Sequence, residues 1–185
     1  GRTTAEAPLT ENTFLIWKGG TVRVFRLTAC YRIQNGNSGI QYRSAVADAN
    51  RWIVRGYQAD IEAGPNYTGI FYEEGGRGIL TERGLQCEID PAGTRSVTRF
   101  AESAKLQGDI HSDGWNTYVI EARGEHFRHF VNGQLMSDSH DGETEHAKSE
   151  GVLALQLHQG PPMEVRFRTI RLERLCYERA WWFRG

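Results

Sequence analysis

Hydrophobic and polar positions alternate through the stretch from Gly151 to Leu172, before and after a Gly-Pro-Pro break. Alternation with a period of two is typical of a strand with one buried face, so this stretch predicts a hairpin of two half-buried strands. In the first strand, leucines face one way and small or polar residues face the other: Leu153, Leu155 and Leu157 against Ala154, Gln156 and His158. Because same-face neighbours lie about 7 Å apart, Gln156 and His158 belong to one polar strip.

Two earlier segments repeat this pattern. They carry polar side chains on one face of a strand: Gln41 and Arg43 over residues 40–44, and Gln58, Asp60 and Glu62 over residues 56–62. If the apolar residues of all three strands point inward, the polar residues point outward together. The sequence therefore predicts one polar surface built from amide, guanidinium, carboxylate and imidazole groups.

The rest of the chain also reads as short strands and turns. Apolar runs between turn residues predict strands over residues 14–17, 21–33, 68–72, 78–81, 115–123, 126–131 and 134–136. Asn132-Gly133 between two such runs indicates a type I′ hairpin. Residues 82–113 are mostly polar and predict a long connection with a short helix over Val97–Ala104.

Composition agrees with an all-β chain. There are 21 glycines, aromatic residues make up 11%, and apolar runs with a helical period are missing, which together favour many strands joined by tight turns. At 185 residues the chain fits one domain with a real core. We expect a two-sheet antiparallel β-sandwich, or jelly roll, over residues 13–175, with an arm or linker over 1–12 and a tail over 176–185.

Charge and hydropathy narrow the possible partners. The 22 Lys and Arg are balanced by 23 Asp and Glu, so no basic face is available for a nucleic-acid backbone, and nucleic acid is not an expected partner. No apolar run approaches the roughly 20 residues that cross a bilayer. The first 12 residues lack the apolar core of a signal peptide, although a cleaved one could already be gone.

The cysteines give little support to a metal site or a disulfide framework. Cys30, Cys87 and Cys176 are odd in number and isolated, and the sequence has no C-x-x-C pair. Three buried or free thiols are the favoured interpretation, with a single bridge between Cys30 and Cys176 as the alternative. No cofactor is predicted, and the sequence leaves a divalent cation such as Ca²⁺ open.

Seven motifs carry a resemblance to a known family. In chain order they are TFLIWKGGTVRVFRL, NSGIQYRS, GYQADI, YTGIFYEEGGRGIL, DGWNTYVIEARG, HFVNGQLMSD and GVLALQLHQGPPMEVRFRTIRL. Together, over residues 13 to 172, they resemble the 3-keto-disaccharide hydrolase domains, whose fold is the concanavalin A-like lectin/glucanase jelly roll. Two departures are that the family's usual opening segment is missing, and that Val24 and Arg26 stand where acidic residues are more common.

The resemblance implies a carbohydrate enzyme that is secreted or periplasmic. Its implied substrate is an oligosaccharide or glycoside already oxidised at C3, where the carbonyl acidifies the C2 proton and allows elimination of the glycosidic bond, followed by hydration. On this hypothesis His158 or Asp60 is the base and Arg43 anchors the enolate or a hydroxyl. The remaining residues bind or position the sugar: Gln41, Gln58 and Gln156 by hydrogen bonds, and Tyr72 by stacking.

Other interpretations stay open. The same face could serve a non-catalytic, lectin-like sugar-binding module. A glucanase of the same fold is disfavoured because its E-x-D-x-x-E strand corresponds here to a segment that begins with Gln58, and an amide cannot be the nucleophile of a retaining mechanism. At the level of single residues, His158 could be a partly buried structural histidine bonded to Asp60 or to a carbonyl, and Arg43 could form a structural ion pair with Asp60.

Overall fold

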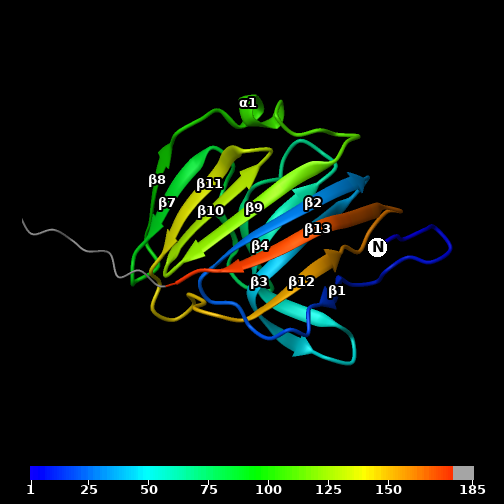
Figure 1. Ribbon diagram of the computed structural model, residues 1–185, viewed down its shortest axis with the longest axis horizontal. Coiled ribbons are helices and arrows are strands. Elements are labelled where there is room, and N and C mark those ends of the chain that lie inside the picture. Colours follow the sequence, from blue (N-terminus) through cyan, green and yellow to red (C-terminus); the bar gives the residue numbers. More distant parts are fainter. Residues whose placement is uncertain (177–185) are drawn as a thin grey trace, which may run out of the picture.

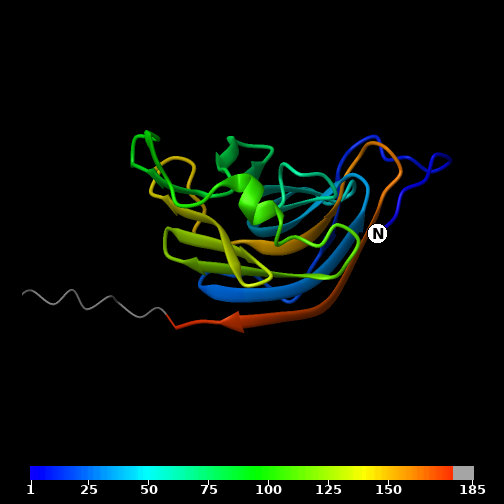
Figure 2. The same ribbon diagram turned by 90° about the horizontal axis from the view of Figure 1, so that it is seen from above.

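The alternating segments form two mostly antiparallel β-sheets that stack face to face. In this computed structural model, which describes residues 1–176, Figures 1 and 2 show the two layers from the front and from above. One sheet has six strands in the order β1 (Thr13–Ile16), β12 (Val152–Leu157), β3 (Asn37–Asp48), β4 (Ile53–Glu62), β5 (Phe71–Glu74) and β6 (Gly78–Thr81).

The second sheet has seven strands. Their order is β13 (Glu164–Arg174), β2 (Phe25–Gln34), β9 (Asn116–Arg123), β10 (His126–Val131), β11 (Gln134–Asp141), β7 (Leu85–Ile89) and β8 (Arg95–Arg99). Every neighbouring pair is antiparallel except β11 with β7. The predicted two-sheet jelly roll is therefore confirmed.

The core lies between the sheets and is built from the inward-facing members of each alternation. On β4, Tyr57, Ala59 and Ile61 are completely buried in it, and on β12 the leucines pack against the same cluster. Rings from both sheets meet at its centre, where Phe127 of β10 lies 5.0 Å from Tyr57 and 5.1 Å from Phe71, centre to centre. These contacts fix which face of the six-stranded sheet points outward.

The predicted hairpin over residues 151–172 is wrong in its pairing. Its two strands form as expected, but β12 belongs to the six-stranded sheet and β13 to the seven-stranded sheet, so they do not pair with each other. The Gly160-Pro161-Pro162 turn carries the chain from one layer to the other. The Asn132-Gly133 hairpin between β10 and β11 does form, with φ of 51° and 84° at its two turn residues.

The helix predicted over Val97–Ala104 is also misplaced. Residues 95–99 form the edge strand β8, whose backbone pairs with β7, and the short helix α1 (Ser103–Gln107) follows it. Val97 is exposed on this edge strand, so its side chain gave no burial pattern that could separate strand from helix.

The first residues of the chain lie against the start of β13. Thr3 is buried, its N–H donates to the carbonyl of Met163 at 2.9 Å, and the terminal amino group of Gly1 donates to the carbonyl of Val165 at 2.8 Å. The segment then crosses to β1 in the other sheet. The expected tail over 176–185 lies outside the described residues beyond Cys176.

All three cysteines are free thiols, so the alternative bridge between Cys30 and Cys176 is not formed. Within residues 1–176 there is no helix with the length and apolar character needed to span a membrane.

Candidate functional site

A polar cleft of about 500 Å³ opens on the outer face of the six-stranded sheet, within the size range of ligand sites in proteins. Four residues predicted from the sequence line it: Gln58, Asp60, Tyr72 and His158. Further lining residues supply two carboxylates, two amides and a second aromatic ring: Glu62, Glu74, Asn12, Asn37 and Tyr67. We refer to this site as the polar cleft.

A chain of amide hydrogen bonds runs across the floor of the cleft and ends at Asp60. Gln41 and Gln58 are direct neighbours on β3 and β4, and the Gln41 amide donates to Gln58 Oε1 at 2.7 Å. Gln58 Nε2 then donates to Asp60 Oδ1 at 2.5 Å, and Asn37 Nδ2 donates to Asp60 Oδ2 at 3.0 Å. Both carboxylate oxygens are therefore held in place by neutral donors.

Gly39 makes room for this series of hydrogen bonds. It lies opposite Asp60 in the β3–β4 pairing, and a Cβ atom at this position would lie 2.4 Å from Gln58 Cδ. Heavy atoms do not approach so closely, so any side chain here would push the Gln58 amide away from Asp60. Gly39, in the NSG segment before Ile40, thus leaves the space beneath the cleft that the Gln58 amide occupies.

Asp60 is only 5% exposed, and no Lys or Arg among residues 1–176 forms an ion pair that would compensate its charge. Burial raises the pKa of Asp60 to about 7, against the opposing effect of the amide donors from Asn37 and Gln58, and the nearby charges of Glu62 and Glu74 raise it further. A carboxyl group with a pKa near neutrality can both take up and release a proton under physiological conditions.

Glu74 lies above the cleft floor and connects three parts of the chain. Its Oε1 accepts a hydrogen bond from Asn12 Nδ2 at 2.9 Å, and its Oε2 accepts one from Gln156 Nε2 at 3.3 Å. Gln156 is buried behind Glu74, and its Oε1 has no partner among the described residues. The sequence reasoning missed Glu74, although it is two residues from Tyr72 on β5 and therefore shares its face.

His158 and Tyr72 lie on the walls of the cleft. His158 follows the last residue of β12, is partly exposed, and donates from Nδ1 to the carbonyl of Gln159 at 2.5 Å. It makes no hydrogen bond with Asp60 in the part of the chain that the structure describes, so of the two structural partners considered above, Asp60 and a carbonyl, it has the carbonyl. Tyr72 is paired with Gln58 across β4 and β5, and burial raises the pKa of its hydroxyl.

Arg43 does not reach the polar cleft, and its predicted place on the same face as Gln41 is wrong. Its Nε donates to the carbonyl of Arg23 at 2.9 Å, and its Nη1 donates to the carbonyl of Gly124 at 2.6 Å. The guanidinium carbon lies 4.8 Å from the centre of the Phe127 ring, which belongs to the core between the sheets. Neither the predicted enolate contact in this cleft nor the alternative ion pair with Asp60 is formed.

A β-bulge explains the position of Arg43. The register of β3 with β4 shifts between Tyr42 and Ala45, and Arg43 has a φ of +45°, so the alternation of faces breaks at this residue. Gly56 lies opposite the bulge with a φ of 138°, and an added Cβ would lie 2.7 Å from the Cα of Ser44. A glycine inside an otherwise alternating strand was the sequence signal for this irregularity.

A second buried carboxylate, Asp141, has a different environment near Arg43. It is completely buried, and Arg77 donates to both of its oxygens, at 3.0 Å to Oδ1 and 2.6 Å to Oδ2. The Tyr57 hydroxyl also donates to Oδ2 at 2.5 Å. Burial acts to raise the pKa of Asp141, but the hydrogen bonds from Arg77 and Tyr57 outweigh it and hold the pKa below its usual range.

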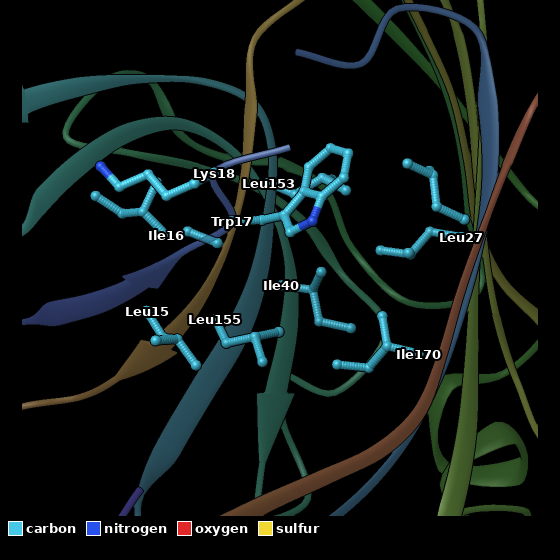
Figure 3. A pocket seen from close by; sticks show the side chains of 11 residues that line it. Leu15, Ile16, Trp17, Lys18, Leu27, Ile40, Leu153, Leu155 and Ile170 are labelled. Carbon is cyan, nitrogen blue, oxygen red and sulfur yellow. The ribbon is translucent and has the colours of Figure 1, made fainter. Parts of the chain in front are cut away.

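An apolar groove of about 540 Å³ lies between the open edges of the two sheets (Figure 3). Leu15 and Leu155 come from the six-stranded sheet and Ile170 from β13, and the Trp17 ring lies between these layers. Of the described residues that line it, Lys18 is the one with a charge. Because this groove offers almost no hydrogen-bonding groups, it is a poor match for sugar hydroxyls, and the polar cleft is the better candidate.

Metal binding has no obvious site here. Across residues 1–176 no three His, Cys, Asp or Glu side chains are grouped closely enough to hold a metal ion.

Comparison with known proteins agrees with the motifs and the fold. The family model of the 3-keto-alpha-glucoside-1,2-lyase-like domain matches residues 1–173. The chain belongs to this family. Membership in the 3-keto-alpha-glucoside-1,2-lyase-like family confirms the resemblance seen in the sequence and supports a carbohydrate-related hydrolase or binding function. No curated protein is similar enough to the chain to count as a match.

Solved structures share the fold of this 3-keto-alpha-glucoside-1,2-lyase-like domain at low identity. Carbohydrate binding module CBM66 from Bacillus subtilis is 17% identical with a TM-score of 0.57, over 92% of this chain and 89% of that chain. A protein from Parabacteroides distasonis ATCC 8503, described as a presumed glycosyl hydrolase, is 15% identical with a TM-score of 0.54, over 90% and 85% of the two chains. At these identities the likeness shows the jelly roll alone.

Proposed function

We propose that the polar cleft cleaves the glycosidic bond of 3-keto-glycosides, with Asp60 as the base that removes the C2 proton. The observation that carries this proposal is a buried carboxylate in a sugar-sized cleft, with a pKa of about 7, which is held by two amides and pairs with no cation in the described part of the chain. Family membership supports the substrate class, because the family's name describes a lyase of 3-keto-alpha-glucosides. We infer a secreted or periplasmic location from the same resemblance.

The chemistry starts at the C2–H bond of the keto sugar. The Asp60 carboxylate takes the C2 proton, the C–H electron pair forms a C2=C3 double bond, and the carbonyl oxygen becomes an enolate. When the enolate collapses, a C1=C2 double bond forms and the C1–O bond breaks, so that the aglycone leaves with its oxygen and takes up a proton. Addition of water across the resulting enone completes a net hydrolysis.

Other cleft residues fit the remaining tasks. His158 is at the rim and partly exposed, where an imidazole can protonate the leaving oxygen and exchange its proton with water. The amides of Asn37 and Gln58 hold the base, and Gln41 and Gln156 support Gln58 and Glu74 from behind. Tyr72 lies beside Gln58 as a ring on which a pyranose can stack.

A non-catalytic sugar-binding module is the second candidate. The observation that favours it is the exposed wall of the cleft, where Tyr67 is 43% exposed and could stack on a sugar without any chemistry. A glucanase mechanism is disfavoured because Gln58, an amide, occupies the place in the cleft where a nucleophilic carboxylate would be needed.

The test compares two substrates that differ only in oxidation at C3. The protein is incubated with a 3-keto disaccharide and with its unoxidised parent, and released monosaccharide is followed. We expect turnover of the keto sugar alone and a loss of about 10²–10⁴-fold in the Asp60→Asn variant. Glu125→Gln, which changes a carboxylate at a distant exposed turn between β9 and β10, serves as the control with unchanged turnover.

Each alternative has its own outcome in this assay. Turnover of the parent sugar alone would support a glucanase. Saturable binding of either sugar without turnover would support the binding module and contradict the proposed reaction.

A further inference from the structure

Acidic side chains outnumber basic ones among the residues that line the polar cleft. Asp60, Glu62 and Glu74 are carboxylates, and among the lining residues that the structure describes His158 is the one basic side chain, with neither Lys nor Arg present. Over the whole chain acidic and basic residues are nearly equal in number, 23 against 22, so this local excess is not a consequence of composition.

Glu62 and Glu74 are held by neutral groups. Glu62 Oε2 accepts hydrogen bonds from the backbone N–H groups of Asn66 at 2.8 Å and Tyr67 at 3.0 Å. Glu74 is held by the side-chain amides of Asn12 and Gln156. Neither carboxylate has an ion-pair partner among the residues that the structure describes, so both are fixed in position while their charges remain uncompensated.

The neighbouring residue Glu73 shows what a compensated carboxylate looks like in the same strand. Its Oε2 lies 2.5 Å from Arg77 Nε, and its Oε1 lies 3.3 Å from Lys148 Nζ. Because side chains alternate along β5, Glu73 faces its cations and Glu74 faces the cleft. The charge of Glu74 is therefore available to a ligand, whereas that of Glu73 is not.

Two arginines lie close to the cleft but turn away from it. Arg83 donates to the carbonyls of Thr68 and Pro65, at 2.9 and 2.6 Å, and Arg95 donates to the carbonyl of Ile79 at 2.8 Å. Neither lines the cleft. They reduce the negative field at longer range but leave no cation that could bind an anionic sugar directly.

We propose that the polar cleft selects sugars by charge, with Glu62 and Glu74 as the selecting residues: a sugar that carries an amine binds more tightly than a neutral sugar, and a sugar that carries a carboxylate is rejected. An ammonium group gains Coulomb attraction from the two fixed carboxylates, and a carboxylate is repelled by them. This inference rests on the proposed sugar site, but it does not depend on catalysis.

The experiment measures binding of three sugars that differ at one position. Methyl α-D-glucoside, methyl 6-amino-6-deoxy-α-D-glucoside and methyl α-D-glucuronide are titrated separately into ¹⁵N-labelled protein, and the side-chain amide signals of Asn37 and Gln58 are followed. We expect the amine to bind about tenfold more tightly than the neutral sugar and the carboxylate about tenfold more weakly. Added salt should narrow both differences.

Variants of Glu62 and Glu74 test whether these two residues cause the differences in affinity. In Glu62→Gln/Glu74→Gln the three affinities should converge to within about twofold, and in the control Glu125→Gln the ranking should be unchanged. Folding of each variant is checked by the same amide spectrum.

Two different results would overturn the inference. Equal affinities in the wild type, or a ranking that survives in the double variant, contradict charge selection and leave the proposed reaction standing. Absence of binding by all three sugars contradicts the sugar site itself, and charge selection fails with it.

Discussion

Asp60 and Asp141 are both buried carboxylates that accept hydrogen bonds on both oxygens, yet they behave in opposite ways. Asp141 is paired with the guanidinium of Arg77, and its pKa lies below the usual range. Asp60 has two amides and no cation, and its pKa is raised to about 7. The comparison teaches that burial alone does not decide the role of a carboxylate: a cationic partner makes it structural, and neutral donors leave it able to exchange a proton.

The largest expected effect is on stability and comes from breaking the structural pair. Arg77→Met leaves Asp141 buried beside Tyr57 without its cation, which should cost about 3–5 kcal/mol of the free energy of unfolding. Denaturant unfolding at pH 7 measures it. A cost under about 1 kcal/mol would mean that the Arg77 pair is not what holds Asp141 in place.

The second prediction concerns stability as a function of pH. Between about pH 4 and pH 7 the unfolded chain has already released the Asp60 proton while the folded protein keeps it, so Asp60 makes the wild type lose stability as pH rises. The full difference is on the order of 4 kcal/mol, from a pKa of about 7 against 3.8. Unfolding of the wild type and Asp60→Asn is compared at pH 4, 6 and 8.

Asp60→Asn removes the titrating group, so the variant should gain on the wild type across this window and show no further gain above about pH 8. A stability difference that is independent of pH would contradict the raised pKa.

A smaller effect is expected from the amide that holds the base. Gln58→Leu removes the donor to Asp60 Oδ1, and because hydrogen bonds to charged groups are worth about 1.5–3 kcal/mol, the pKa of Asp60 should rise by a further 1–2 units or so. The pH at which kcat/KM reaches half of its plateau reports this shift. Gln41→Leu, one amide further from the carboxylate, is the matched control and should shift it less.

The smallest effect on stability is expected at the rim. His158→Ala should lower turnover of a 3-keto disaccharide by about 10²–10⁴-fold while changing the free energy of unfolding by no more than about 0.5 kcal/mol. The ring is partly exposed, and within residues 1–176 its one hydrogen bond is to the Gln159 carbonyl. A large drop in melting temperature would instead indicate a structural histidine.

The sequence was informative wherever the structure depends on the alternation of apolar and polar residues along one strand. Alternation in β4 placed Tyr57 and Ile61 in the core and Gln58 and Asp60 on the outer face, because a strand in a two-layer sandwich turns only one set of its side chains toward the other sheet. The same reasoning assigned the leucines of β12 correctly.

The sequence was not informative where a single residue, or a contact between distant segments, determines the structure. The bulge at Arg43 reverses the faces within a single strand, and only the glycine at position 56 hinted at it. Glu74 reaches its partner Asn12 across 62 positions of sequence, and no local pattern contains such a contact. The pairing of β12 and β13 with different sheets is likewise a property of the whole fold.

The most direct test of Asp60 as a proton carrier is the pKa of its carboxyl group, measured by ¹³C NMR of the side-chain carboxyl carbons from pH 3 to 9 and assigned with Asp60→Asn. We expect one aspartate to titrate near pH 7 and to vanish in the variant, while Asp141 stays ionised over most of the range. A midpoint for Asp60 at or below about pH 4, the ordinary value for an aspartate, would contradict this role.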